Sequence, residues 1–461
     1  MALAVGVSRS VASCHHAAHM TPGDSQIRFF AATDVGKVRD HNEDNFLVDK
    51  KLSLFMVADG MGGHAAGEVA SAIAVRTVHE ELKREKDLIS DYLAGATGAA
   101  KVTPKDIVAL LEHAVQRACS KIHEEAQADS AKRGMGTTLS ALLVLGPKGF
   151  IAHVGDSRIY LMRSGRVQQV TEDHTVFNEL VKRGKLPKEQ IEKVAQKNAI
   201  TRAVGVYERV EVDTLAIEVL PGDMFVLASD GLTGYLEGPE ELREHLQLEG
   251  DAAVKSLVKL ANDRGGKDNI TSVIVKLGEE GVLDEARARR LALKRDVLAK
   301  MPLFGRLTER ELLRVMQAVE VRVYAADQMV IKEGERGDEL FIVLAGTVRV
   351  SRGDAVLTRL GVGEHVGEMA LIRSVPRSAT VTAEEEGAEL IAIRRTDFFE
   401  ILRKEHELAV KMLWQFLGVL ADRLDHMNTE LRTAREELAA EDMSGEIFPV
   451  DLDTLPFNRP S

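Results

Sequence analysis

The sequence predicts an α+β protein built from two compact units and a long helix near the end of the chain. Over residues 28–276, short strand-like runs such as SLFMVA and MFVLAS alternate with helical segments. From residue 301 to 395, a helix precedes short strands that are separated by glycines, a pattern typical of a small jelly-roll barrel. With 461 residues, the chain is long enough to give each unit its own hydrophobic core.

Changes in composition divide the chain into five segments. Residues 1–25 are small, polar and aperiodic, so they predict a disordered extension before a first unit at 26–278. A charged helix without a wide apolar face predicts a linker over 279–300. The second unit and the long helix then occupy 301–440, and a disordered tail is expected over 441–461.

Apolar residues recur at three- and four-residue spacings along the long helix. They are Leu402, Met412, Leu413, Phe416, Leu420, Leu424, Met427 and Leu431. Such a stripe predicts packing either on the helix's own unit or on a partner helix, which would give a homodimer.

Net charge, hydropathy and cysteine content indicate which classes of protein this chain does not resemble. The net charge of −12 argues against nucleic-acid binding. No apolar run approaches the ~18 residues that cross a membrane. Two cysteines, Cys14 and Cys119, cannot build a disulfide framework, so a cytoplasmic protein is expected.

Acidic residues stand at the ends of several predicted strands. The strand-end acids are Asp59, Asp156, Asp230 and Asp268, and Glu43 and Asp44 form a further acidic pair. Each acid alone is more often a turn-former, but neighbouring strands would bring several carboxylates to one sheet edge. Clustered carboxylates repel unless they are protonated or share cations, and oxygen-only ligands favour Mg²⁺ or Mn²⁺. The sequence therefore predicts a metal site at this edge, where Gly60 allows its backbone carbonyl to approach the metal.

Six motifs occur in the order found in one known family. They are RDHNED (39–44), VADGMGGHAAGEVAS (57–71), GMGTTL (134–139), HVGDSRIYL (153–161), ASDGL (228–232) and GGKDNIT (265–271). With them, residues 28–276 resemble the bacterial form of the metal-dependent serine/threonine protein phosphatases of type 2C. The resemblance implies an α-β-β-α sandwich, in which helices flank two antiparallel sheets that pack face to face.

The resemblance also implies roles for individual residues. Asp59 would bridge two Mg²⁺ or Mn²⁺ ions, Gly60 would offer its carbonyl, Asp230 and Asp268 would each bind one ion, and Asp156 would bind a third, weaker one. Glu43, Asp44 and Asn269 would bind or orient metal-bound waters, and Arg39 would grip the substrate phosphate with its planar fork of donors. The implied reaction is hydrolysis of phosphoserine and phosphothreonine by a hydroxide that bridges the cations, with Arg39 and Asp59 as the catalytic residues.

One position departs from many members of that family. They carry a histidine, a candidate general acid, directly after the Asp-Gly pair, whereas Met61 stands there in this chain. His64 follows three residues later, and its role stays open between catalysis, the structure of the turn and the binding of a water next to the metal site. His174 and Arg202 are interpreted as structural, and Cys119 as a packing residue.

The second unit contains the segment GEMALIRSVPRSAT between two predicted strands. It resembles the phosphate-binding cassette of cyclic nucleotide-binding domains. By that resemblance Arg377 would pair with the cyclic phosphate and Glu368 would accept from the ribose. Gly367, Ala370, Ser378 and Ala379 would complete the cradle. The cassette does not choose between cAMP and cGMP, and a domain that keeps the fold without its ligand is the alternative.

Together these features predict a phosphatase whose activity a cyclic nucleotide modulates. Its partners would be phosphoserine and phosphothreonine proteins, such as a serine/threonine kinase or its targets. Two alternatives stay open: a nucleotide-sensing scaffold with an inactive phosphatase fold, and a ligand-responsive transcription factor. The latter needs a DNA-binding motif after the long helix, where only an acidic, proline-containing tail follows Glu441.

Overall fold

The computed structural model describes residues 27–62, 66–95, 101–182, 199–278 and 282–444. The expected N-terminal extension and the open question of His64 lie outside these residues. The expected C-terminal tail does so from residue 445, since 441–444 continue the last helix. Within the described part of the chain, no helix is both long and apolar enough to cross a membrane.

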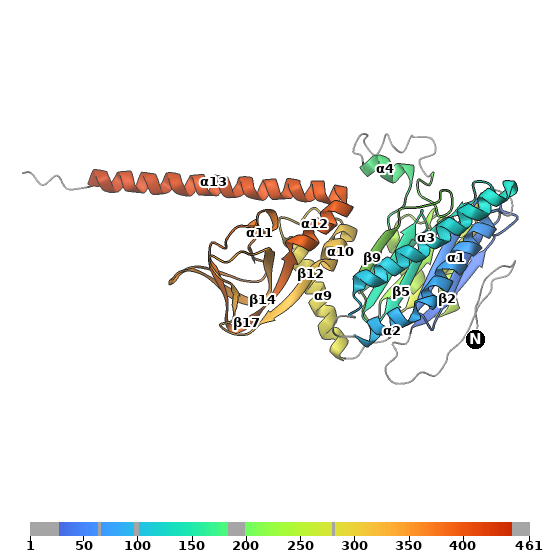
Figure 1. The fold of residues 1–461 in the computed structure, drawn as a ribbon, viewed down its shortest axis with the longest axis horizontal. Coiled ribbons are helices and arrows are strands. Elements are labelled where there is room, and N and C mark those ends of the chain that lie inside the picture. Colours follow the sequence, from blue (N-terminus) through green and yellow to red (C-terminus); the bar gives the residue numbers. More distant parts are fainter. Residues whose placement is uncertain (1–26, 63–65, 96–100, 183–198, 279–281, 445–461) are drawn as a thin grey trace, which may run out of the picture.

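Two antiparallel sheets form the first unit (Figure 1). One has the order β1 (Arg28–Asp34), β11 (Ile270–Lys276), β10 (Met224–Ala228), β7 (Arg158–Arg163) and β8 (Arg166–Gln169). The other has the order β2 (Asp44–Asp49), β3 (Leu54–Met61), β5 (Leu139–Leu145), β6 (Lys148–Val154) and β9 (Asp213–Glu218), with β4 (Gly136–Thr137) beside β3. Phe55, Val57, Phe225 and Val273 belong to the buried cluster that joins the two sheets.

Helices cover both outer faces of this sandwich. The larger ones are α1 (Ala66–Arg84) and α3 (Pro104–Ala128) on one face and α8 (Asp251–Asp263) on the other. Shorter helices are α2 (Lys86–Ala94), α4 (Val176–Lys182), α6 (Asp230–Thr233) and α7 (Leu242–Leu246), with single 3₁₀ turns at Ser130–Lys132 and Pro239–Glu241. The predicted α-β-β-α sandwich is therefore confirmed.

The second unit is a small antiparallel barrel flanked by helices. Its sheet has the order β12 (Val319–Tyr324), β17 (Thr380–Arg394), β14 (Glu339–Arg352) and β15 (Ala355–Leu360), with β13 (Met329–Ile331) on β17 and β16 (His365–Val366) on β14. The helices are α9 (Val282–Lys300), α10 (Glu309–Gln317), α11 (Met369–Ile372), α12 (Arg395–Lys404) and α13 (His406–Ser444). Val297 and Leu298 are buried in the core of this unit, so the last turn of the charged helix α9 packs with the barrel.

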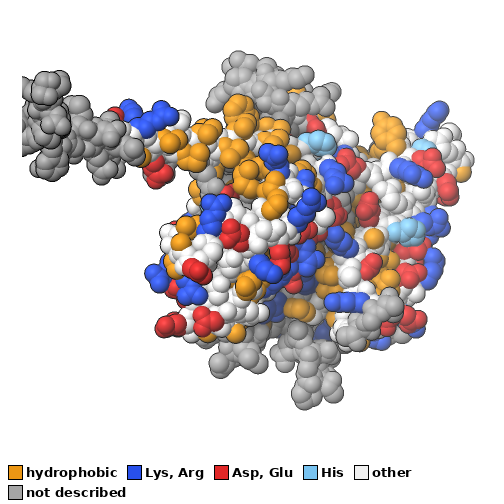
Figure 2. Space-filling view, turned by 60° about the vertical axis from the view of Figure 1, so that its left-hand side comes forward, with side chains coloured by type: hydrophobic (Ala, Val, Ile, Leu, Met, Phe, Trp, Pro, Cys, Tyr) orange, Lys and Arg blue, Asp and Glu red, His pale blue; other side chains and the backbone are white. Residues whose placement is uncertain are grey.

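The long helix divides into two halves with different surroundings. Met412 is buried and Phe416 half-buried against the barrel core, whereas Leu413 is exposed, so only part of the first half of the apolar stripe packs on its own unit. Leu424, Met427 and Leu431 are exposed where α13 extends beyond the barrel (Figures 1 and 2).

Helix α10 lies between the two units (Figure 1). A capping box fixes its start, because Thr308 Oγ1 accepts from the Glu311 amide at 3.3 Å and the Thr308 amide donates to the Glu311 carboxylate at 2.8 Å. Leu312 and Val315 face the barrel core, whereas Leu313 packs on the inter-sheet cluster of the first unit. A separate ion pair, from Lys105 on α3 to Glu400 on α12 at 2.7 Å, also joins the units.

Candidate active site

The strand-end acids gather at one edge of the sandwich. Asp44 begins β2 and lies directly opposite Asp59 near the end of β3. Asp230 follows β10, Asp156 follows β6, and Asp268 precedes β11. Because neighbouring strands run antiparallel, these strand ends and strand starts meet at the same edge.

Burial and mutual repulsion disfavour the ionised form of these acids. Burial raises the pKa of Asp59 well above its usual range, and the charges of Asp44, Asp230, Asp156 and Asp268 raise it further. The pKa values of Asp44 and Asp156 are each raised to about 7, chiefly by burial. A group of carboxylates under such repulsion is stabilised when a cation binds.

Three buried carboxylate oxygens at this edge accept no hydrogen bond from any described residue. They are Asp44 Oδ1, Asp156 Oδ1 and Asp230 Oδ1. A buried unsatisfied oxygen is costly, and an oxygen-rich acidic site fits a hard divalent cation. In the described part of the chain, however, no three Asp, Glu, His or Cys side chains already converge as a finished ligand set. The oxygen ligands and negative charge of these residues therefore suit a divalent cation, and their side chains would have to move when the cation binds.

Gly60 is required by close packing of backbone. A Cβ at this position would lie 2.1 Å from the Gly67 carbonyl oxygen at the start of α1 and 2.6 Å from the Glu43 carbonyl oxygen. The Gly60 amide donates to the latter oxygen at 3.2 Å. The absence of a side chain thus lets β3, α1 and the Glu43 segment meet beside Asp59.

Asn269 holds together the loops around the acids. Its amide nitrogen donates to the carbonyls of Val35 at 3.0 Å and His41 at 2.8 Å, and its Oδ1 accepts from the Glu43 amide at 2.8 Å. All the polar groups of this buried side chain are therefore engaged with backbone. Asn269 acts here as a scaffold for the segment that carries Glu43 and Asp44.

Arg39 lies at the exposed rim of the same edge. Its Nη2 donates to Asp268 Oδ2 at 2.7 Å, and the two side chains are 51% and 37% exposed. The hydrogen bond to Asp268 raises the pKa of the guanidinium, which is a cation at neutral pH in any case. The candidate phosphate-binding residue and a candidate metal ligand are thus ion-paired with each other.

The predicted cassette residues of the second unit also come together. The Arg377 guanidinium donates to the Glu339 carbonyl oxygen at 2.7 Å, and a Cβ at Gly337 or Gly367 would collide with it. Burial lowers the pKa of Arg377, while the charges of Glu339, Asp338 and Glu368 raise it. The Ala370 amide already bonds to the Gly367 carbonyl at 3.0 Å, whereas Ser378 is exposed on the cassette loop. The two glycines therefore make room for the arginine.

A shallow depression lies beside Glu368, between the barrel and the long helix. Its lining is mostly apolar and comes from Met301, Pro302, Leu303, Leu340, His365, Glu368, Phe416, Val419 and Leu420. The first half of α13 therefore forms one wall of the space next to the cassette.

Comparison with known proteins assigns both units. A family model described as protein phosphatase 2C matches residues 37–262, and one described as cyclic nucleotide-binding domain matches residues 321–405. The serine/threonine phosphatase stp of Listeria innocua is 39% identical over 250 residues, which cover 53% of this chain and 93% of the relative. The chain belongs to the protein phosphatase 2C family.

A second relative agrees with this assignment. The protein phosphatase PhpP of Streptococcus pneumoniae is 37% identical over 253 residues, or 54% of this chain and 96% of the relative. The crystal structure of the Mycobacterium tuberculosis serine/threonine phosphatase PstP/Ppp is 35% identical, covers 55% of this chain and 99% of that one, and superposes with a TM-score of 0.47. The protein is a serine/threonine phosphatase with a C-terminal cyclic nucleotide-binding domain.

Three hydroxyl groups of the phosphatase domain that support Asp59 and Asp44 were not predicted from the sequence. The Thr138 hydroxyl accepts from the Asp59 amide at 2.9 Å and lies 2.7 Å from the Ser157 hydroxyl. Ser229 donates to Asp44 Oδ2 at 2.7 Å. Thr138, Ser157 and Ser229 each lie inside one of the six family motifs. The motifs therefore include these residues, but the sequence does not show which groups they contact.

The residues interpreted as structural in the phosphatase domain make buried contacts. Cys119 is buried and accepts from the Gly205 amide at 3.3 Å. The His174 ring accepts from the Gly155 amide, next to Asp156, at 3.1 Å. Arg202 pairs with Asp213 at 3.1 Å, so His174 and Arg202 belong to one network beside the acidic edge.

Proposed function

We propose that the phosphatase domain hydrolyses phosphoserine and phosphothreonine with two Mn²⁺ or Mg²⁺ ions at the acidic edge. This proposal rests on the three buried carboxylate oxygens that accept no hydrogen bond from the described residues. Asp59, Asp230, Asp268 and the Gly60 carbonyl would hold the two ions, and Asp156 a third, weaker one. When bound, the ions supply a nucleophile derived from water and offset the charge of the phosphate.

The chain's own residues then bind and orient the substrate. Arg39 is half exposed and presents a planar fork of donors that matches two phosphate oxygens. When substrate binds, Arg39 would release Asp268 and donate hydrogen bonds to the phosphate instead. Thr138 fixes the backbone of Asp59, and Asn269 fixes the segment that carries Glu43 and Asp44, so these acids are held ready to position water.

We further propose that the second domain binds a cyclic nucleotide, cAMP or cGMP, and thereby modulates the phosphatase. Arg377 would pair with the cyclic phosphate, and Glu368 would accept from the ribose. The Ser378 hydroxyl and backbone groups of Gly367, Ala370 and Ala379 lie in the same cassette. The shallow apolar depression beside Glu368 would be one surface open to the base. Because α13 forms one wall of it, ligand binding there would change the contacts of the long helix.

A phosphatase assay on the full-length chain tests both proposals. With phosphoserine and phosphothreonine peptides, turnover should rise with added Mn²⁺, and Asp59→Asn should lower kcat by about 100-fold or more. No metal-dependent turnover by the wild-type protein would favour the nucleotide-sensing scaffold instead. Substrates in the cell would be phosphoproteins, including a serine/threonine kinase or its targets.

The nucleotide proposal needs a matched pair of cassette variants. Arg377→Ala should weaken cAMP or cGMP binding by about 10- to 100-fold, because a charge-assisted contact is lost. The exposed Arg373 lies on the same loop, and Arg373→Ala should bind nucleotide as the wild type does. Calorimetric titration measures binding, and the change in kcat at saturating nucleotide measures modulation. Unchanged turnover under verified binding contradicts modulation.

A further inference from the structure

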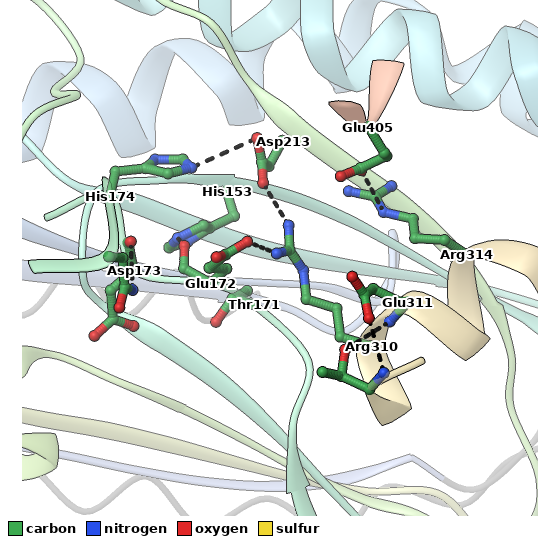
Figure 3. A network of polar contacts seen from close by, with 12 residues as sticks. His153, Thr171, Glu172, Asp173, His174, Asp213, Arg310, Glu311, Arg314 and Glu405 are labelled. Carbon is green, nitrogen blue, oxygen red and sulfur yellow. Dashed lines mark hydrogen bonds and ion pairs between the residues drawn. The ribbon is translucent and has the colours of Figure 1, made fainter. Parts of the chain in front are cut away.

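Arg310 on α10 reaches from the cyclic nucleotide-binding domain into the phosphatase domain (Figure 3). It forms ion pairs with Glu172 and with Asp213, the latter at 2.8 Å. The side chains of Arg310, Glu172 and Asp213 are 19%, 24% and 21% exposed. Burial lowers the pKa of the Arg310 guanidinium to about 10, so the group is a cation at neutral pH. The ion pairs are therefore largely shielded from water and from screening by salt.

One branch of contacts runs from Asp213 to the turn that carries Asp156. Asp213 Oδ1 lies 3.5 Å from His174 Nε2. His174 Nδ1 accepts from the Gly155 amide at 3.1 Å, and the His174 amide donates to the Gly155 carbonyl at 2.8 Å. Because Nδ1 is an acceptor, Nε2 carries a proton that faces Asp213. Three contacts in succession thus connect Arg310 with the backbone that precedes Asp156.

A second branch runs from Glu172 to Asp59. The Glu172 carbonyl accepts from His153 Nε2 at 3.0 Å, and His153 Nδ1 lies 2.9 Å from the Ser140 hydroxyl. Ser140 donates to the Ser157 carbonyl at 2.9 Å. The Ser157 hydroxyl, 2.7 Å from the Thr138 hydroxyl, then leads to the Asp59 amide. Figure 3 shows Glu172 and Asp213 between Arg310 and the two histidines, His153 and His174, whose ring centroids are 5.0 Å apart.

The local geometry makes the turn before Asp156 sensitive to this network. Gly155 has a φ of +106°, and a Cβ there would lie 2.6 Å from Thr138. The turn is therefore packed tightly against the threonine that supports Asp59. Without Arg310, Glu172 would lose its ion pair to the second domain. Among the described residues, Asp213 would then keep Arg202 as its only arginine or lysine partner within 4 Å. Repulsion between these two carboxylates would then act on the segments that hold His153 and His174.

We propose that Arg310 is a positioning residue for the phosphatase reaction. Its ion pairs with Glu172 and Asp213 fix the position of residues 153–157 relative to Asp59. The affinity of the acidic edge for a cation therefore depends on how the second domain docks on the phosphatase domain. This inference rests on the proposed cation-dependent function. It adds a residue that lies outside the segment matched by the phosphatase family model, which ends at 262.

Titration of the full-length protein with Mn²⁺ alone tests the proposal, with Arg310→Ala and Lys105→Ala as a matched pair. Both variants remove an ion pair between the domains, but Lys105 contacts Glu400 and Asp397 and lies outside the network. Arg310→Ala should weaken Mn²⁺ binding by about 10-fold, the lower end of what outer contacts of metal ligands cost. Lys105→Ala should bind Mn²⁺ within about twofold of the wild type, since single exposed pairs contribute little.

A second readout does not depend on metal or turnover. Hydrogen–deuterium exchange of metal-free protein should speed up in peptides spanning 149–160 for Arg310→Ala and stay unchanged for Lys105→Ala. Arg310→Lys should fall between the wild type and Arg310→Ala in both measurements, because a point charge cannot hold two carboxylates as a planar fork does. If Arg310→Ala folds poorly, Glu172→Gln provides the same comparison from the phosphatase side.

The outcomes separate this inference from the proposed function. An active, Mn²⁺-dependent wild type with unchanged Mn²⁺ affinity and exchange in Arg310→Ala overturns the positioning role alone. Equal losses in Arg310→Ala and Lys105→Ala also overturn it, because domain docking in general would then be responsible. A wild type that neither binds Mn²⁺ nor turns over phosphopeptide overturns both proposals.

Discussion

Arg39 Nη2 and Asp268 Oδ2 lie 2.7 Å apart, although 229 positions separate the two residues in the chain. The loop before β2 and the loop before β11 thus place a candidate phosphate ligand against a candidate metal ligand. Both side chains are partly exposed, so the pair is open to exchange of partners. The substrate phosphate would compete with Asp268 for Arg39, and a cation would compete with Arg39 for Asp268. Binding of either ligand would therefore free a residue for the other.

Substitution of Arg39 should therefore affect substrate more than fold. We expect Arg39→Ala to lower kcat/KM for a phosphopeptide by about 100-fold, because a charged donor to the phosphate is lost. Arg39→Lys should recover part of this loss, since it keeps the charge without the fork. The thermal midpoint of unfolding should stay close to that of the wild type, because exposed ion pairs stabilise weakly. Equal kcat/KM for Arg39→Ala and the wild type would contradict the role.

Removal of divalent cations should destabilise the phosphatase domain. At a free Mn²⁺ concentration 100 times the dissociation constant, we expect a gain of about 2.7 kcal/mol over the chelator-treated protein. Asp230→Asn should lose most of this gain. It should also unfold at a higher temperature than the wild type when both are metal-free, because one repelling buried carboxylate is absent. Differential scanning calorimetry with and without chelator measures both effects, and a chelator-insensitive wild type argues against bound metal.

Gly60 should not tolerate a side chain. Gly60→Ala places a methyl group against the backbone of Gly67 and Glu43, which we expect to cost about 3 kcal/mol and most of the activity. Gly238→Ala is the control, because Gly238 has an extended φ of 179° and open space around its missing Cβ. That variant should stay within about 0.5 kcal/mol of the wild type in denaturant unfolding. Similar losses of stability in the two variants would show that local packing is not the reason why position 60 needs a glycine.

His153 should make stability depend on pH. Burial lowers the pKa of His153 well below its usual 6.5, so the folded protein keeps this ring neutral. The unfolded chain binds a proton there below about pH 6.5 and the folded chain does not, so stability is lost as pH falls. Relative to His153→Gln, the wild type should lose up to about 1.4 kcal/mol per pH unit between pH 6 and 5. Urea unfolding at several pH values measures this difference, and parallel pH profiles would contradict it.

The acidic edge could be predicted because its signals are local in sequence. Asp59, Asp156 and Asp230 each follow a short apolar strand, and the end of a strand places a side chain with little freedom. The alternation of strands and helices likewise predicted the elements of the sandwich. The family resemblance implied two antiparallel sheets, but the order of the strands within them is known only from the structure, because pairing between distant strands leaves no local mark in the sequence.

Other features depend on contacts between distant segments and could not be predicted. The approach of the Gly60 carbonyl to a metal stays a prediction, and the sequence did not indicate that the missing side chain also makes room for Gly67 and Glu43. Arg310 stands in an ordinary charged helix start, RLTERELLRVM, and nothing in that stretch indicates Glu172 or Asp213 as its partners. Charged residues on helix surfaces usually face solvent, so only the docking of the two domains reveals its place.

The break between α12 and α13 at Glu405 gives the long helix a mechanical property. At about 1.5 Å per residue, the 39 residues of α13 span about 58 Å. A rotation of about 10° about Glu405 would displace the far end of such a rod by about 10 Å. Glu405 also pairs with Arg314 at 3.0 Å, one helical turn after Arg310. A small change of angle between α12 and α13 would therefore begin next to the boundary between the two domains and grow along the helix towards Ser444.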